Sequence, residues 1–252
     1  MERKMLYAIS SIQELDVNKL NKLELGLEIQ DFVGPNMTEE RRQSLTIEYM
    51  EKLKHLRGIK AIHGPFLDLK PASPDKMIRE ISHKKYLDTL RIARQLDVNY
   101  LIFHSQINPY LNEPNLKKLN NNQAKEFWQA IMEEVPDFKG TIVIENIFEE
   151  EPDMLVELIE TIAMPNIRIN LDIGHANLGK VPLETWFKSL REYISYIHIH
   201  SNNGKYDQHR SPSDERIGEL YSLLDKYNIN PSLSLEYKIE NLEDETKRYK
   251  GR

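Results

Sequence analysis

The stretch Thr141-Ile142-Val143-Ile144-Glu145 is a short, continuously apolar run that ends in a carboxylate. Such a run is typical of a parallel strand that helices cover on both faces. Seven further runs of this kind occur along the chain, at Leu6–Ile9, Leu25–Glu28, Ala61–His63, Tyr100–His104, Ile167–Asp172, Tyr196–His200 and Ser232–Glu236. The sequence therefore predicts eight strands distributed over its whole length.

Amphipathic stretches with helix start signals separate these strands. Expected helices run over residues 38–56, 73–93, 121–135, 154–162, 183–193 and 217–227, and the acidic run Glu149–Glu151 is expected to be a helix start that complements the helix dipole. Strand and helix alternating eight times in 252 residues predict a (β/α)8 TIM barrel, one domain over residues 1–252. Because only residues 241–252 follow the last strand, we expect a truncated final helix. A doubly wound open sheet is the alternative, but its glycine-rich phosphate-binding turn is missing.

The amino-acid composition argues against several classes of protein. The chain has no cysteine, so any zinc must be held by nitrogen and oxygen ligands. A net charge of −6 gives no general attraction to nucleic acid. No apolar run approaches the roughly 20 residues of a membrane span, and the first residues lack a signal-peptide core. We therefore expect a cytoplasmic protein with no membrane partner.

Histidines and carboxylates gather at or just after the ends of the expected strands. They are His63, His104, Glu145, Asp172, His175, His198, His200, Asp207, His209 and Glu236. In a parallel barrel all these strand ends lie on one face, so the side chains converge there. Clustered carboxylates without a counter-charge repel one another, whereas bound dications remove that repulsion. The pattern predicts a metalloenzyme.

Four residues are expected to contact the substrate. His198-x-His200 places both imidazoles on one strand face, and only one of them needs to bind metal. Lys205 and Arg210 flank Asp207-x-His209 and are suited to pairing with phosphate. Glu28, at the end of the second expected strand, is also within reach of the strand ends. The expected substrate-binding set is His200, Lys205, Arg210 and Glu28.

From about Leu25 to Glu236 the chain resembles the xylose isomerase-like barrels, which include sugar isomerases, sugar epimerases and endonuclease IV-type apurinic endonucleases. The resemblance implies one to three divalent ions, with zinc favoured over manganese or iron. A first ion would be held by His63, His104 and Glu145. Glu145 would bridge to a second ion, held also by Asp172, His198 and Glu236. A third would be held by His175, Asp207 and His209.

The sequence departs from the endonuclease type in three places, one of which is Ile173-Gly174 before His175, where those members often have Thr-Cys. Glu145-Asn146 continues into Ile147–Glu150 where those members usually have glycine-rich sequence, and residues 32–36 contain no recognisable DNA-penetrating residues. A small sugar or phosphoester substrate is therefore favoured over DNA.

Three hypotheses follow. The first and favoured one is a phosphoester hydrolase with two or three metal ions, in which Glu145 bridges two of them. The second is a single-metal isomerase or epimerase of sugars or sugar phosphates, in which Glu145 and Glu236 transfer the proton. The third is a non-catalytic barrel that binds a ligand. Glu145 and Glu236 are the expected catalytic residues.

Overall fold

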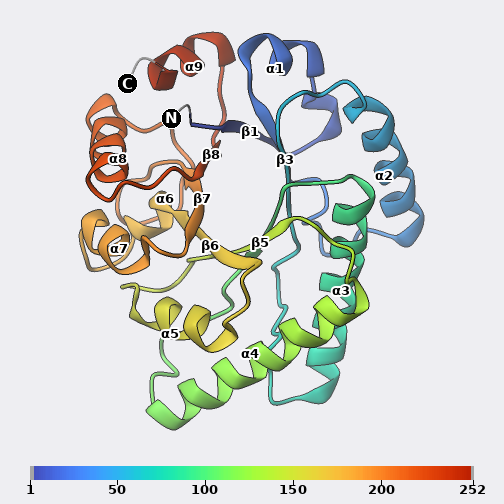
Figure 1. The fold of residues 1–252 in the computed structure, drawn as a ribbon, viewed down its shortest axis with the longest axis vertical. Coiled ribbons are helices and arrows are strands. Elements are labelled where there is room, and N and C mark those ends of the chain that lie inside the picture. Colours follow the sequence, from blue (N-terminus) through green and yellow to red (C-terminus); the bar gives the residue numbers. More distant parts are fainter. Residues whose placement is uncertain (1–2, 251–252) are drawn as a thin grey trace.

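The computed structural model describes residues 3–250, in which eight parallel strands close into a barrel in the order of the sequence (Figure 1). The strands are β1 Met5–Ile9, β2 Gly26–Ile29, β3 Lys60–His63, β4 Tyr100–His104, β5 Thr141–Glu145, β6 Ile167–Asp172, β7 Ile194–Ile199 and β8 Ser232–Leu235. Each expected strand is present, and its ends differ from the prediction by at most two residues. The predicted TIM barrel is confirmed.

Helices surround the barrel on its outside (Figure 1). They are α1 Val17–Leu23, α2 Glu39–Leu53, α3 Lys76–Gln95, α4 Pro114–Glu134, α5 Asp153–Ile162, α6 Ile173–Ala176, α7 Leu183–Leu190, α8 Asp214–Lys226 and α9 Leu242–Lys250, with a 3-10 turn at Ile12–Glu14. The short α9 agrees with the expected truncated final helix. None of the helices in residues 3–250 is long and apolar enough to cross a membrane.

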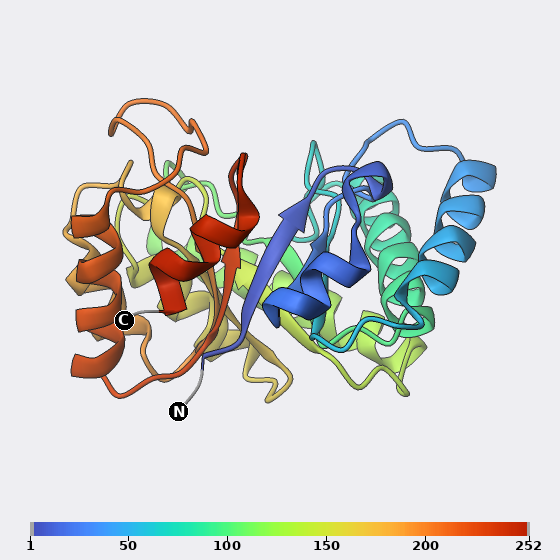
Figure 2. The ribbon, with the colours of Figure 1, turned by 90° about the horizontal axis from the view of Figure 1, so that it is seen from above.

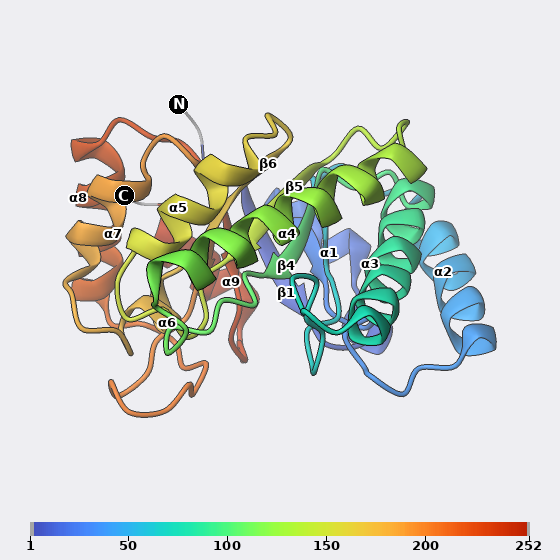
Figure 3. The same cartoon turned by 90° about the horizontal axis from the view of Figure 1, so that it is seen from below.

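Helix α4 begins seven residues before the predicted start at Asn121. The Glu113 side chain accepts a hydrogen bond from the Leu116 amide and caps the first turn. Pro114 occupies the first turn, where the amide hydrogen that proline lacks would have had no partner. The first turns carry few apolar residues, so periodicity alone did not indicate them. Figure 3 shows α4 lying obliquely across the outside of the barrel.

Alternation along the strands produces two layers inside the barrel. Leu6, Ala61, Ile102, Val143 and Tyr196 pack together as an apolar layer without exposed surface. Two residues further along the strands come His63, His104, Glu145 and His198. The apolar layer thus fills the barrel beneath its C-terminal end, the face above which the β7–α8 loop rises in Figure 2. This end carries the polar side chains.

Candidate metal centre

A cavity of about 600 Å³ opens at the C-terminal end of the barrel. Its lining comes from loops and strand ends around most of the ring. The predicted site residues in it are His63, His104, Glu145, His175, Asp207, His209 and Glu236. Asp172, His198 and His200 lie beneath them with at most 1% of their surface exposed.

His198 lies at the centre of a first group of side chains. Its Nδ1 is 3.1 Å from Glu145 Oε2, 3.0 Å from Glu236 Oε2 and 3.6 Å from Asp172 Oδ2. His63 Nε2 lies 3.4 Å from the same Glu145 oxygen, while His63 Nδ1 lies 2.9 Å from the Gly64 carbonyl oxygen. Because Nδ1 of His63 is engaged with the backbone, Nε2 is its free ligand atom.

Glu28, which the sequence suggested as a substrate contact, lies behind His198. Its Oε2 is 3.0 Å from His198 Nε2 and accepts a hydrogen bond from the Tyr196 hydroxyl at 2.8 Å. The Gln30 amide donates both to Glu28 Oε1 at 3.0 Å and to Glu236 Oε1 at 2.7 Å. Since Glu28 has no exposed surface, it is not placed to bind substrate. With Glu28 as the partner of Nε2, Nδ1 of His198 would be the atom available to a metal ion.

A second group surrounds Asp207 on the β7–α8 loop. Asp207 Oδ2 is 3.1 Å from His175 Nε2 and 3.0 Å from His209 Nε2. His200 stacks on His209 with ring centres 3.9 Å apart. These four residues each offer a ligand atom within 4.8 Å of the others. His200, expected to contact substrate, is thus nearly buried beside the candidate ligands.

The β7–α8 loop is held in place by its backbone. Ser201 and Arg210 pair across its base with two hydrogen bonds of 2.8 Å. His209 adopts a left-handed conformation with φ 44°, and its Nδ1 lies 2.9 Å from the Glu236 carbonyl oxygen. A left-handed non-glycine residue carries strain, which occurs often at functional sites. The loop therefore presents Asp207 and His209 in a fixed geometry.

Asp172 and Glu145 join the two groups. Asp172 Oδ2 is 3.0 Å from His200 Nε2 and 3.4 Å from His175 Nδ1, and Glu145 Oε1 is 3.2 Å from the same His175 atom. Gly174 makes this approach possible, because a Cβ at that position would lie 2.0 Å from the His200 ring. The sequence Asp172-Ile173-Gly174-His175 thus needs its glycine for space.

Two buried amides that the sequence analysis missed hold the carboxylates. Asn146 pairs with the Asp172 backbone, accepting from its amide at 2.8 Å and donating to its carbonyl at 3.0 Å. Asn170 donates to Glu145 Oε2 at 2.9 Å and accepts from the His198 amide at 3.1 Å. Asn170 shares its strand face with Asp172, two residues on, and that alternation was the available signal.

Three predicted residues lie apart from these groups. Among residues 3–250, His104 is absent from every cluster of three or more candidate ligand atoms, although it lines the cavity. Its ring stacks on Phe66 at 4.2 Å, and burial lowers its pKa to about 3, which keeps the imidazole neutral. Lys205 and Arg210 are exposed loop residues and do not line the cavity.

The carboxylates and histidines of the site shift one another's pKa values. Burial opposes ionisation of Glu145 and Asp172, but the surrounding histidines outweigh it and hold both pKa values well below the usual range. Burial likewise opposes protonation of His175, yet Asp172, Asp207 and Glu145 raise its pKa to about 12. Within the described chain, Lys70 is the only lysine or arginine that lines the cavity. The carboxylates therefore draw positive charge into the centre.

The donor set fits divalent metal ions. Among residues 3–250, three buried polar atoms of the site make no hydrogen bond of good geometry, namely His198 Nδ1, His200 Nδ1 and Glu236 Oε2, although His198 Nδ1 and Glu236 Oε2 lie 3.0 Å apart as an ion pair. Unpartnered buried nitrogen and oxygen atoms cost free energy unless something else satisfies them. Imidazole nitrogen and carboxylate oxygen are the ligands that zinc, manganese and iron accept in proteins.

Comparison with known proteins identifies the family of the chain. Residues 24–251 match the family described as the xylose isomerase-like TIM barrel. The chain belongs to this family. The resemblance inferred from the sequence is thereby confirmed, and the family is one of enzymes.

Three similar proteins illustrate how far the likeness extends in sequence and in structure. An uncharacterized protein of Methanocaldococcus jannaschii is 25% identical over 94% of this chain and 81% of its own length. A probable endonuclease 4 of Aquifex aeolicus is 26% identical over 69% of this chain and 65% of its own length. The structure of a D-tagatose 3-epimerase-like protein superimposes with a TM-score of 0.74 at 22% identity, covering 99% of this chain and 95% of that one. The last likeness shows the shared fold.

Proposed function

We propose that this family member is a metal-dependent phosphoester hydrolase with a di- or trinuclear centre. The observation that carries the proposal is the group around Asp207, where His175 Nε2 and His209 Nε2 lie 3.1 and 3.0 Å from one carboxylate oxygen. A single-metal reaction at Glu145, Asp172, His198 and Glu236 does not need this second group. The 26% identity to a probable endonuclease 4 supports the same reaction class.

The candidate ligands divide between the two groups. Glu145, Asp172, His198 and Glu236 would hold one ion, and His175, Asp207 and His209 would hold another. His63 would join Glu145 at a third, whereas His104 lies outside the clusters of candidate ligand atoms. When bound, divalent ions supply Lewis-acid stabilisation of phosphoryl oxygens and make water a better nucleophile. Zinc is the proposed metal, since the set combines imidazole with carboxylate.

The residues of the chain position the reactants and move protons. In the hydrolysis, water adds to phosphorus, the bond from phosphorus to the alcohol oxygen breaks, and the alcohol leaves with a proton. Glu236 lines the cavity, and apart from its ion pair with His198 its Oε2 makes no hydrogen bond in the described chain, so it is placed to carry that proton. Glu145, 1% exposed and anchored by Asn170, is the fixed carboxylate between the groups.

A small substrate is part of the proposal. Protein surfaces that hold DNA use several lysines and arginines on the phosphates. Lys70 is the only such residue lining the cavity in residues 3–250, and the net charge is −6. A cytoplasmic location remains a prediction from the sequence.

A sugar isomerase or epimerase is the second candidate. Glu145 Oε2 and Glu236 Oε2 both lie within 3.1 Å of His198 Nδ1, which places two carboxylates at one prospective metal position. Such a pair suits proton removal and return next to a polarised carbonyl group.

The experiment that separates the candidates removes the second group. In the double variant Asp207→Ala with His209→Ala, the hydrolase account predicts loss of one metal equivalent and of phosphoester cleavage, because a transition-state charge loses its stabilising ion. The matched control is Lys205→Ala with Arg210→Ala, two exposed residues of the same loop. Both proteins are assayed on phosphomonoesters, phosphodiesters and ketoses. An unchanged metal content with ketose interconversion retained would contradict the hydrolase and support the isomerase.

A further inference from the structure

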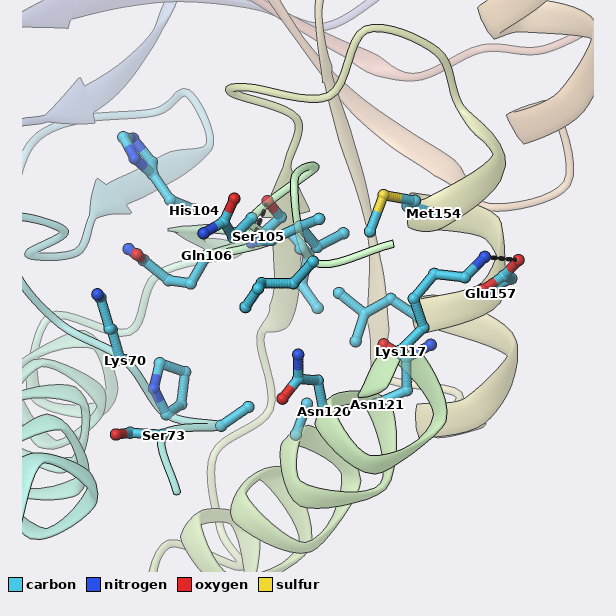
Figure 4. A pocket seen from close by; sticks show the side chains of 18 of the residues that line it. Lys70, Ser73, His104, Ser105, Gln106, Lys117, Asn120, Asn121, Met154 and Glu157 are labelled. Carbon is cyan, nitrogen blue, oxygen red and sulfur yellow. Dashed lines mark hydrogen bonds and ion pairs between the residues drawn. The ribbon is translucent and has the colours of Figure 1, made fainter. Parts of the chain in front are cut away.

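A second cavity, of about 270 Å³, lies beside the metal-side cavity, between α4, α5 and the loop that follows β4 (Figure 4). The two cavities share Lys70, His104 and Gln106 in their linings. The two cavities therefore adjoin along these three residues, so a group in the side cavity would lie next to the metal-side cavity. Together the two spaces exceed what a single small sugar needs.

The side cavity has an apolar floor and a polar rim. Trp128, Ile144 and Leu158, all buried core residues, form part of the floor. Asn120 and Asn121 line it from α4, and both are half-buried. In residues 3–250 neither side-chain amide makes a hydrogen bond to another protein group. Each amide can donate one hydrogen bond and accept another, which suits hydroxyl or amide groups on a ring with an apolar face.

Charge within the side cavity is balanced except at its border. Lys117 Nζ pairs with Glu157 Oε1 at 2.8 Å, so these opposite charges compensate one another (Figure 4). Lys70 has no carboxylate partner among residues 3–250 and belongs to both linings. The interior therefore favours a neutral group, while the boundary with the metal-side cavity favours an anionic one.

The wall between the two cavities is rigidly built. Gln106 adopts a left-handed conformation with φ 56°, and its side-chain amide donates to the Phe66 carbonyl at 3.0 Å. The neighbouring Ser105 hydroxyl donates to the buried Glu149 carboxylate at 2.5 Å. These contacts tie the loops after β3, β4 and β5 together. The side cavity is thus preformed, as small-molecule sites usually are.

We propose that the side cavity is a substrate subsite, which holds a neutral ring attached through its oxygen to the phosphoryl group. The substrate class is then the phosphoester of a sugar or a nucleoside, since both rings combine an apolar face with hydrogen-bonding edges. The phosphoryl group lies at the border, near Lys70 and the candidate metal ligands. This assignment rests on the proposed phosphoester hydrolase, but the side cavity can be tested by binding alone.

The binding experiment uses zinc-loaded protein and two probes without phosphate, uridine and methyl β-D-ribofuranoside, followed by ligand-observed NMR. At least one probe is expected to bind, and the stronger one identifies the ring. The double variant Asn120→Ala with Asn121→Ala is expected to weaken that binding about tenfold, the effect of two lost hydrogen bonds near the lower end of their usual net contribution. Asn122→Ala, exposed on the same helix and outside the lining, is the control. Lys70→Met should leave these neutral probes unaffected.

The turnover experiment compares uridine 5′-phosphate, ribose 5-phosphate and the acyclic glycerol 3-phosphate. A preference for a ring substrate that disappears in the Asn120/Asn121 variant supports the subsite. Binding of a neutral probe that depends on these amides, without cleavage of any phosphoester, supports the subsite and overturns the hydrolase. Cleavage of all three phosphoesters with equal efficiency, unchanged in the variant, overturns the subsite and leaves the hydrolase standing. Failure of both neutral probes to bind also overturns the subsite.

Discussion

Two neighbouring layers inside the barrel differ in chemistry although the same strands build them. The lower layer contains Ala61, Ile102 and Val143, which are fully buried and apolar. Two residues further along, the same strands carry His63, His104 and Glu145. Because side chains alternate along a strand, stability and chemistry occupy adjacent levels of one scaffold. A substitution in one layer should therefore affect a different measurement from a substitution in the other.

The largest effect is expected from a substitution in the upper layer, and it is an effect on activity. Glu145→Gln removes the charge of the carboxylate that joins both donor groups, so nearly all turnover should be lost while the fold persists. Turnover is measured on the best phosphoester substrate, and circular dichroism reports the fold. Retention of more than about a tenth of wild-type turnover, a barrier change of ~1.4 kcal/mol or less, would show that Glu145 does not have this role.

The second largest effect is expected from a substitution in the lower layer, and it is an effect on stability. Ile102→Ala leaves a cavity in the apolar layer and should lower the free energy of unfolding by about 2–5 kcal/mol. Urea denaturation of the metal-free protein measures it, with Ile47→Ala, 61% exposed on α2, as the matched control. Equal stability of the two variants would mean that the apolar layer does not support the barrel. Below its unfolding transition, Ile102→Ala should still bind metal.

A smaller effect tests the link between the layers. Glu28→Gln places an amide where His198, Tyr196 and Gln30 all direct donors toward a carboxylate. The neutral amide also gives His198 a weaker partner, so zinc affinity should fall about 10- to 100-fold. Zinc titration in the presence of a competing chelator measures the change. The control is Glu133→Gln, an exposed residue of α4. Identical affinities in both variants would remove Glu28 from the site.

The sequence alone predicted the strands and most candidate ligands. Apolar runs mark strands, and a histidine or carboxylate at the end of a parallel strand must face the same side of the barrel as the others. The first turns of α4 were missed because residues 114–120 contain little apolar periodicity. Short helices such as α1 and α6 offer too few turns for a periodic pattern.

Contacts between distant strands could not be predicted in this way. Alternation indicates that Glu28 faces inward but not that His198 covers it, because the distance across the barrel depends on strand stagger. Glu149 belongs to an acidic run that favours a helix start, yet it precedes α5, which begins at Asp153, and is only 3% exposed. Its carboxylate accepts from Ser105, and burial raises its pKa. Only the three-dimensional packing distinguishes it from Glu150 and Glu151.

The measurement that tests the central claim most directly is the metal content of wild-type protein purified without added metal or chelator. Elemental analysis per chain, repeated after zinc titration, counts the ions that the two donor groups hold. The account predicts two or three equivalents of zinc, manganese or iron, one of which is lost in the Asp207→Ala, His209→Ala variant. A content that stays at one equivalent or less after titration would contradict a multinuclear centre.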